Sequence, residues 1–379
     1  MNSTAPSRSH LPALDGLRGL AILLVIVVHY GFGFDRVGLG RLELATQNVT
    51  RLGWVGVDLF FVLSGFLITG ILLDAKGNNR YYRTFYARRM LRIFPVCYLL
   101  LLIIHFVNPI AYASDPTELA HFLSDEPWLW GYLANFRAVA VSRLGACHTA
   151  HFWSLAVEEQ FYLFWPFLVA ITPGKRFRAL CFSLIGTAIA SRLALVGIGV
   201  PHAAIHTLLF TRMDSLALGA LLASLAREPE GLARIRPLAA KLLAPSAMVV
   251  VGLGLVFHSV SRHGMVMLTA GFTLLAIFFG SLLVLVVTAG KQSATAWFFE
   301  SPPMRFFGKY SYAIYLYHFP LRPFVERLVD VRQPLAGSLI LRQLVCLFVG
   351  TVLSTGLALV SWTLLEKPFL SLKKHFEYE

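Results

Sequence analysis

The sequence predicts an all-α protein that crosses a membrane several times. Of its 379 residues, 57% are hydrophobic and only 14% are charged, a composition far from that of a soluble domain. Apolar runs of about 20 residues recur along the chain, which is the length that an α-helix needs to cross a bilayer. A transmembrane β-barrel would instead show short segments of alternating hydrophobicity. The long runs therefore favour a bundle of membrane helices.

Ten candidate spans account for most of the chain. Their approximate ranges are 13–34, 54–74, 91–111, 151–172, 179–199, 207–226, 243–260, 267–289, 306–325 and 339–365. The connections are short and no internal repeat is visible, so we expect one membrane domain over 13–366, between an N-terminal segment, 1–12, and a tail, 367–379. The longest connection, 112–150, contains EPWLWGYLANF, whose aromatic residues predict an interfacial or re-entrant element.

The positive charges predict the orientation of these spans. With the N-terminus inside, 21 of the 33 lysines and arginines fall on the cytoplasmic side, 10 outside and 2 within spans. Cytoplasmic loops of membrane proteins are enriched in these residues. We therefore expect a protein of the cell (inner) membrane with both termini on the cytoplasmic side. The bias accounts for the net charge of +13 without a nucleic-acid partner. The four scattered cysteines include no CxxC pair, so the sequence predicts no metal site and no disulfide framework.

The first span contains an arginine and a histidine, Arg18 and His29, within GLRGLAILLVIVVHYGFGF. Eleven residues at 100° each leave the two side chains about 20° apart around the helix and about 16 Å apart along it. Taken singly, Arg18 could be a snorkelling anchor and His29 could bond a neighbouring helix. A shared polar face favours a cavity instead, with Arg18 near the cytoplasmic boundary and His29 towards the outside.

Further polar residues interrupt the second and fourth spans. Asp58 could hold a histidine proton or an arginine, or it could lie at the solvated membrane edge. Ser64 is weaker evidence, because serine can bond its own helix backbone. Glu158 lies inside the run HFWSLAVEEQFYLFWPFL and needs a partner or a proton, since an unpaired carboxylate in hydrocarbon costs several kcal/mol.

A basic segment, RYYRTFYARRMLRIFP, precedes the third span on the cytoplasmic side. Arg88, Arg89 and Arg92 fall at helical spacing, either as ordinary positive flanking or as a phosphate clamp, because guanidinium groups bind phosphate oxygens bidentately. Two weaker features are Arg212 with Asp214, at the expected outer mouth of a span, and His318, three residues after a tyrosine on one helix face. Each of these two features alone favours interfacial packing.

A phosphate clamp on the cytoplasmic side and a histidine deeper in the membrane suggest a donor that carries phosphate groups at one end and its reactive group at the other. In an acyl-thioester of coenzyme A, the phosphates would stay at the inner face while the long pantetheine arm extends into the membrane. The histidine could then act as general base on an acceptor hydroxyl at the outer mouth.

The motifs resemble the integral-membrane acyltransferase family 3, a group of mainly bacterial O-acyltransferases. In chain order they are LDGLRGLAILLVIVVH, GVDLFFVLSGFLI, RRMLRIFP, FWSLAVEEQFY, RMDSLALGALLA, SYAIYLYHFP and EKPF. The resemblance implies about ten core spans and transfer of an acyl group, usually acetyl, from cytoplasmic acyl-CoA. The implied acceptors are extracytoplasmic glycans, peptidoglycan, lipid-linked sugars or small natural products.

The resemblance also implies roles for particular residues. It makes His29 the leading catalytic residue, supported by Glu158, and it makes donor contacts of Arg18, Arg88, Arg89 and Arg92. We further expect Asp58 to assist catalysis, and Ser64 and His318 to contact the substrate. No metal is expected.

Three alternatives stay open from the sequence. Some family members carry an appended extracytoplasmic SGNH-hydrolase-like domain, which is not found here, so we expect direct transfer to the acceptor or handover to a separate protein. A multi-span transporter or flippase could use the same polar residues as a translocation path, although transporters commonly show inverted repeats. A non-catalytic acyl-CoA sensor is the third hypothesis.

Overall fold

The computed structural model describes residues 11–31, 40–256, 266–329, 335 and 337–378. Within these ranges the chain is helical apart from turns and one isolated bridge between Leu335 and Ser338, which confirms the predicted all-α class. The predicted N-terminal segment, 1–12, lies almost wholly outside the described residues. The same holds for the ends of two predicted spans, at 32–34 and 257–260.

The helices follow one another with short connections. They are α1 (Pro12–Tyr30), α2 (Arg41–Arg51), α3 (Gly56–Asp74), α4 (Tyr81–Ala111), α5 (Pro116–Trp130), α6 (Ala134–Ala140), α7 (Phe152–Ile171), α8 (Gly174–Gly197), α9 (His202–Thr207), α10 (Leu209–Leu225), α11 (Arg236–Val256), α12 (Phe272–Val287), α13 (Ala294–Phe299), α14 (Pro302–Leu328), α15 (Leu339–Ser361) and α16 (Lys367–Ser371). Short turns extend several of them: η1 (Leu52–Val55), η2 (Gly231–Ile235), η3 (Met267–Gly271), η4 (Trp362–Glu366) and η5 (Leu372–His375).

The chain is a multi-pass membrane protein. In the part that the structure describes, seven helical segments are long and apolar enough to cross a bilayer, so the count of ten spans stays a prediction. Helices α7 and α14 cover two other predicted spans, 151–172 and 306–325, and both carry charged or polar residues that lower their mean hydropathy. The connection 112–150 holds α5 and α6, where the aromatic run predicted an interfacial element.

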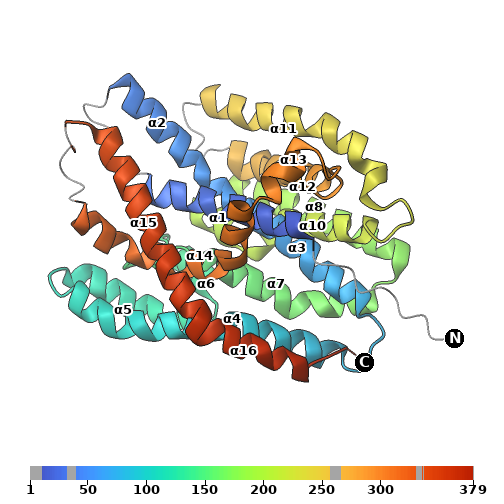
Figure 1. Cartoon of the computed structure of the whole chain (residues 1–379), viewed down its shortest axis with the longest axis horizontal. Coiled ribbons are helices and arrows are strands. Elements are labelled where there is room, and N and C mark those ends of the chain that lie inside the picture. The colour runs from blue at the N-terminus through green and yellow to red at the C-terminus, as the bar shows by residue number, and fades with distance from the viewer. Residues whose placement is uncertain (1–10, 32–39, 257–265, 330–334, 336, 379) are drawn as a thin grey trace.

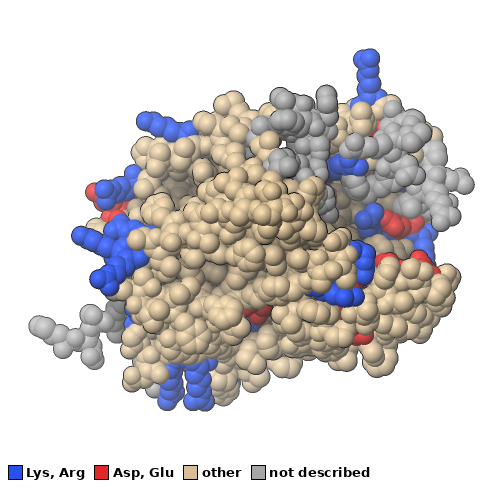
Figure 2. All heavy atoms as spheres, turned by 180° about the vertical axis from the view of Figure 1, so that it is seen from behind, with Lys and Arg blue, Asp and Glu red and all other residues tan. Residues whose placement is uncertain are grey.

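Helix α1 lies near the centre of the bundle, with α15 crossing in front of it in Figure 1. It packs most extensively against α14 and also against α3, while α3 packs against α10. Seen from behind, most of the molecular face is free of charged side chains, which gather mainly towards its ends (Figure 2). A wide uncharged face is what contact with lipid requires, because charged groups in hydrocarbon are costly.

Glycines bring α1 and α14 into direct backbone contact. A Cβ atom at Gly19 would lie 2.1 Å from the carbonyl oxygen of Met304, and one at Gly308 would lie 1.8 Å from that of Asp15. Small residues allow such close approach of membrane helices. The two helices run parallel, since Gly19 lies beside Gly308 and the residues ten positions further on, His29 and His318, also meet. The contact between Gly19 and Gly308 therefore helps to fix the position of both histidines.

Candidate active site

A cavity with an empty volume of about 690 Å³ lies between α1, α3, α4, α7 and α14. It brings together five of the residues that the sequence singled out. They are Arg18, Ser64, Arg89, Arg92 and Glu158, joined in the wall by Phe60, Phe61, Ser154, Tyr162, Tyr312 and Tyr315. The residues come from distant parts of the chain, and helix packing makes them neighbours.

Three arginines give this cavity a positive wall. Among the described residues, none of Arg18, Arg89 and Arg92 forms an ion pair, and their charges act on one another repulsively. The guanidinium carbon of Arg89 lies 5.4 Å from the centre of the Tyr162 ring, a cation–π contact that leaves the N–H groups available. Unpaired guanidinium groups in a partly buried cavity form a site for an anion, and they favour phosphate or carboxylate oxygens.

Glu158 is the carboxylate of the same cavity. Ser64 donates a hydrogen bond of 2.6 Å to Glu158 Oε1, and Tyr162 donates one of 3.1 Å to Ser64 Oγ. The serine therefore bonds another helix, which the sequence could not distinguish from a bond to its own backbone. Two residues further on, Gln160 points elsewhere and bonds Asn135 on α6, as the 100° step between adjacent helical residues requires.

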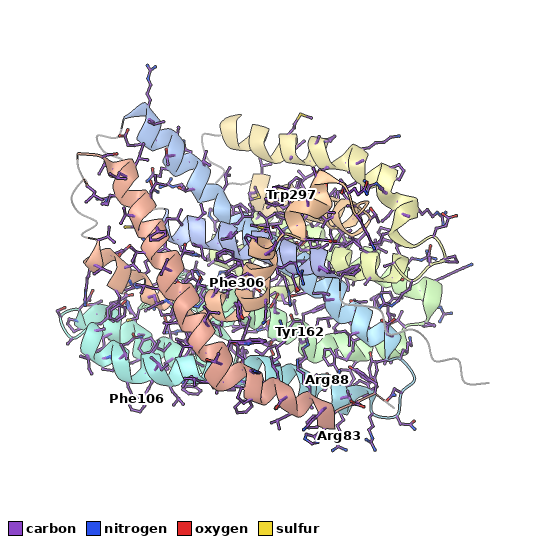
Figure 3. All side chains as sticks on the ribbon, viewed as in Figure 1. Arg83, Arg88, Phe106, Tyr162, Trp297 and Phe306 are labelled. Carbon is purple, nitrogen blue, oxygen red and sulfur yellow. The ribbon has the colours of Figure 1, made fainter. Side chains whose placement is uncertain are left out.

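Arg88 differs from its neighbours because it binds the C-terminal tail. Its Nε donates a hydrogen bond of 2.5 Å to the Phe376 carbonyl, and its guanidinium carbon lies 5.7 Å from the Tyr378 ring centre. Figure 3 shows Arg83 at the margin of the molecule, with Arg88 and Tyr162 further inside. Arg88 thus holds the tail beside α4, next to the arginine cavity, and its predicted contact with a donor stays a prediction.

Ser154 and Tyr315 close the end of the cavity that faces the histidines. Their hydroxyl groups are hydrogen-bonded to each other, and Tyr315 Oη also donates to the carbonyl of His151 at 3.2 Å. Beyond this closure lie the rings of His151 and His318, with centroids 5.5 Å apart. This end of the cavity therefore lies next to a group of histidines.

His29 and His318 form the centre of this histidine group. His318 Nε2 lies 3.0 Å from His29 Nδ1, which also lies 2.9 Å from the Val25 carbonyl oxygen. The ring of Phe319 packs edge-on against His29 at 4.6 Å. His29 thus bonds a neighbouring helix, which was one of the two alternatives that the sequence left open. It also lies close to a polar cavity, which was the other alternative.

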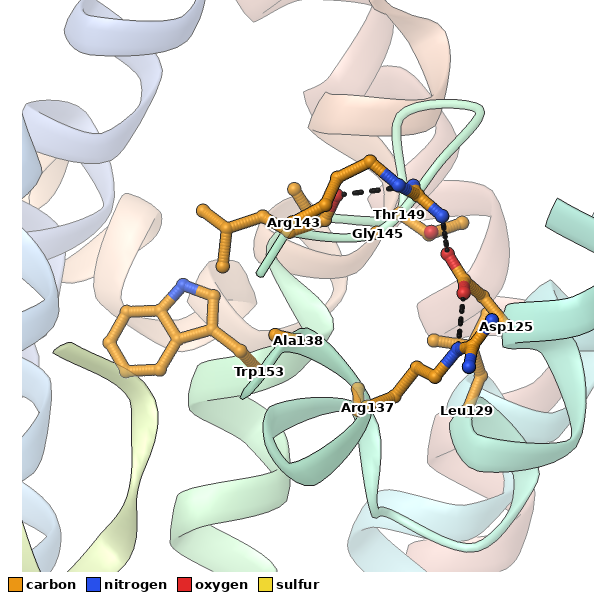
Figure 4. Close-up of a pocket in the computed structure, with 11 residues that line it drawn as sticks. Asp125, Leu129, Arg137, Ala138, Arg143, Gly145, Thr149 and Trp153 are labelled. Carbon is orange, nitrogen blue, oxygen red and sulfur yellow. Dashed lines mark hydrogen bonds and ion pairs between the residues drawn. The ribbon is translucent and has the colours of Figure 1, made fainter. Parts of the chain in front are cut away.

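A loop at 141–151 contacts the histidine group, with the ring of His148 against Phe319 and that of His151 against His318. Asp125 holds it, accepting hydrogen bonds of 2.8 Å from Arg137 and 2.9 Å from Arg143, and the same groups line the small pocket of Figure 4. Cys147 and His148 have left-handed backbones, with φ of 47° and 57°. Such residues cost about 1–3 kcal/mol each, so this loop persists because surrounding contacts such as those of Asp125 hold it.

His148 stays neutral in this loop. Burial, with a further contribution from the charge of Arg322, lowers the pKa of His148 below its usual range. Its Nδ1 lies 2.8 Å from the hydroxyl of Tyr112, and its ring packs against Phe319. A neutral imidazole next to Phe319 adds no positive charge near His29 at physiological pH.

Asp58 is engaged in a buried ion pair. Arg212 Nη2 lies 2.5 Å from Asp58 Oδ1, and both side chains are fully inaccessible to solvent. A second buried pair, Arg192 with Asp214, lies nearby at 2.9 Å. Arg212 and Asp214, expected at the outer mouth of a span, are both buried and are paired with residues of other helices. Of the alternatives for Asp58, the structure has the one with an arginine.

The structure thus places the predicted residues in three groups. The cavity holds Arg18, Ser64, Arg89, Arg92 and Glu158, the histidine group holds His29 and His318, and Asp58 and Arg88 have partners of their own. Sequence reasoning missed the Ser154–Tyr315 closure, whose only signal was a tyrosine sharing a helix face with His318. In the described residues, no group of three or more His, Cys, Asp or Glu side chains could hold a metal ion.

These features define a multi-pass membrane protein with an arginine-lined cavity that lies next to paired histidines. The family model described as an acyltransferase domain matches residues 11–360, and the chain belongs to this family, acyltransferase family 3. Membership makes the protein a transferase.

Three relatives are O-acetyltransferases by name. The "Putative O-acetyltransferase" of Staphylococcus aureus (strain COL) is 29% identical over 84% of this chain and 51% of its own length. Peptidoglycan O-acetyltransferase OatA of Listeria monocytogenes is 27% identical over 88% and 52%, and the "Putative peptidoglycan O-acetyltransferase YrhL" of Bacillus subtilis is 26% identical over 95% and 55%. The chain spans about half the length of these relatives. No solved structure matches it.

Proposed function

We propose that the protein is an O-acyltransferase of the cell membrane that takes an acyl group, usually acetyl, from cytoplasmic acyl-CoA. The acceptor is a hydroxyl of an extracytoplasmic glycan or lipid-linked sugar. One observation carries the proposal: the helix that contributes Arg18 to a cavity with three unpaired arginines carries His29 eleven residues further on. An anion site and a candidate base are thus fixed on one rigid element.

The donor is inferred from the charge of the cavity. Coenzyme A carries phosphate groups at one end and the thioester at the other, joined by a long flexible arm. In the proposed complex, Arg18, Arg89 and Arg92 bind phosphate oxygens, and the arm extends past Glu158 and Ser64 towards Tyr315. The Tyr315 side chain then turns aside from Ser154, so that the thioester reaches the histidines.

His29 acts as the general base in the proposed reaction. Its Nε2 takes the proton of the acceptor hydroxyl as the oxygen attacks the thioester carbonyl. The carbon–sulfur bond breaks, the acyl group stays on the acceptor oxygen, and the CoA thiolate leaves and recovers the proton from His29. The atoms and charges balance without a metal or a redox partner.

The acceptor class follows from the relatives and from the predicted orientation. Two of the relatives are named for peptidoglycan, a glycan outside the cell membrane. With both termini inside, α1 places Arg18 at the cytoplasmic side and His29 about 16 Å further towards the outside. The acceptor hydroxyl would therefore approach His29 from the outer side.

Reconstituted protein tests the proposal directly. Purified protein in liposomes receives acetyl-labelled acetyl-CoA on the side of the termini and soluble peptidoglycan fragments or oligosaccharides on the other. We expect label in an ester on the acceptor. Transport of unmodified acceptor or donor, with no ester formed from any acceptor supplied, would support a transporter and overturn the proposal. Binding of acetyl-CoA with neither transfer nor transport would support a sensor.

The arginine wall makes a separate prediction for donor binding. We expect Arg92→Ala to weaken the binding of acetyl-CoA by about 10- to 100-fold, because a hydrogen bond to a charged group contributes about 1.5–3 kcal/mol. The Kd is measured by equilibrium binding in detergent, which requires no acceptor. The loss should shrink at high salt, since partly exposed charges are screened.

Arg83→Ala is the matched control for this measurement. Arg83 lies on the same helix and also carries a positive charge, but its side chain is exposed and lies outside the cavity. Its removal should leave the Kd unchanged. An equal loss in both variants would mean that general positive charge at the membrane surface, rather than the cavity, attracts the donor.

A further inference from the structure

The two histidines are arranged so that the position of their protons can be derived. A carbonyl oxygen only accepts hydrogen bonds, so a ring nitrogen beside one must carry the proton. His318 Nδ1 lies 2.6 Å from the Tyr315 carbonyl oxygen, and His29 Nδ1 lies 2.9 Å from that of Val25. Both neutral rings therefore carry their proton on Nδ1.

This assignment makes the contact between the rings a directed hydrogen bond. With its proton on Nδ1, neutral His318 has a lone pair on Nε2, and this atom lies 3.0 Å from the Nδ1–H of His29. The His29 proton is shared between His318 Nε2 and the Val25 carbonyl. The Nε2 of His29 is left with its lone pair, and no described residue donates a hydrogen bond to it.

We propose that His318 is a positioning residue that holds His29 with Nε2 free to act as base. The inference rests on the proposed function, in which Nε2 takes the acceptor proton. Once that proton arrives, His29 is positively charged, and its bond to neutral His318 becomes a charge-assisted bond, about twice as strong. His318 therefore stabilises the state that forms during the reaction more than the resting state, which is how a residue assists catalysis.

The same geometry excludes His318 as a proton relay. To pass a proton onward, His318 would have to release the one on Nδ1, but that proton points at the Tyr315 carbonyl, which cannot take it. His318 is also fixed from its backbone side, because Tyr30 on α1 donates a hydrogen bond of 2.5 Å to its carbonyl oxygen. The contact between Gly19 and Gly308 joins α1 to α14 below the histidines, and the Tyr30 bond joins the same two helices beside them.

Other groups surround the pair and enter any pH profile. The titratable and charged side chains near the two rings, from the neighbouring helices and the loop at 141–151, are Tyr30, His148, His151, Tyr315, Arg322 and Glu326. His151 bonds the Leu316 carbonyl through Nε2 at 3.2 Å. That bond places the His151 proton on Nε2 and leaves it no donor to offer His318.

Two substitutions at His318 separate positioning from mere packing. His318→Leu fills much of the same space without an acceptor, whereas His318→Gln keeps an amide oxygen near the former Nε2. We expect His318→Leu to lower kcat by about 10- to 100-fold, with the Kd for acetyl-CoA unchanged. His318→Gln should recover most of this loss. The acidic limb of the kcat/KM profile should move to lower pH in the leucine variant only, because protonated His29 has lost its partner.

The controls keep the outcomes distinct. His121→Leu, at an exposed histidine of α5, should change neither kcat nor the pH profile. A purely structural role for His318 predicts equal losses in the leucine and glutamine variants without movement of the acidic limb, and that result would overturn the inference. Donor binding reports that each variant is folded.

A measurement on the unsubstituted protein tests the proton positions without any His318 variant. Nitrogen NMR of protein labelled in its histidine rings, with the His29 signals assigned by loss in His29→Gln, should show a protonated Nδ1 and a bare Nε2 for His29. A protonated Nε2 at neutral pH would overturn the inference. Because this readout needs no turnover, it stands even if the acyltransferase assay fails, and the two failures can be told apart.

Discussion

Replacing His29 with alanine is expected to lower acyl transfer by about 10²- to 10⁴-fold, the range contributed by a positioned general acid or base. The variant loses His29 Nε2, the ring nitrogen whose lone pair is left free when Nδ1–H bonds His318 and the Val25 carbonyl. Turnover of labelled acetyl-CoA in liposomes measures the loss. The Kd for acetyl-CoA should change little, because the arginine cavity does not include His29.

The comparison between kcat and Kd makes this prediction decisive. His121→Ala serves as the control for removal of a histidine, because His121 is exposed on α5. If His29→Ala kept near-normal turnover, the assignment of His29 as base would be wrong. If it lost donor binding as well as turnover, the substitution would have disturbed the α1–α14 contact, and the result would count against a local role in catalysis.

Asp58 carries the second large prediction, which concerns stability. We expect Asp58→Leu to destabilise the folded protein by about 3–5 kcal/mol, because it leaves Arg212 charged and unpaired in the interior. Arg212 also stacks 3.6 Å from the centre of the Phe272 ring, so its charge cannot move to solvent without disrupting the core. Thermal unfolding in detergent and the yield of folded protein in membranes measure the effect.

A double variant separates stability from chemistry at the same position. Replacing both partners, as in Asp58→Leu with Arg212→Met, should restore folding, because well-packed apolar residues often replace a buried ion pair without loss. If the double variant is folded and active, Asp58 acts through structure alone. If it is folded but inactive, the catalytic role predicted for Asp58 gains support. Asp74→Leu, which breaks the more exposed pair with Arg227, should cost at most about 1 kcal/mol.

Helical periodicity predicts local relations well and distant ones not at all. The 20° offset between Arg18 and His29 follows from the helix itself, and the structure places Arg18 in the cavity wall and His29 in the histidine group beyond Ser154 and Tyr315. The partners of Asp58 and His29 are 154 and 289 positions away in the chain, so no spacing rule could find them. Only the packing of α3 on α10 and of α1 on α14 decides those pairs.

The basic segment shows the same limit within a single helical turn. Arg88 and Arg89 are adjacent, and the 100° step between them sends one to the tail and the other to the cavity. Arg92, three residues after Arg89, returns to the cavity side. The sequence indicated that the three arginines share a helix, but the position of the tail, which decides the role of Arg88, depends on contacts that lie 285 to 290 positions further along the chain.

The parallel contact of α1 and α14 has a consequence for chain length. From Gly19 to His29 and from Gly308 to His318 there are ten residues in each helix, about 15 Å. Removing or adding one residue in either interval would turn its histidine by 100° and shift it by about 1.5 Å, which no rotamer change could repair. Apolar substitutions facing lipid within these two intervals leave the count intact. Insertions and deletions there would break the alignment of the two rings, so the proposed catalytic arrangement depends on the spacing as well as on the residues.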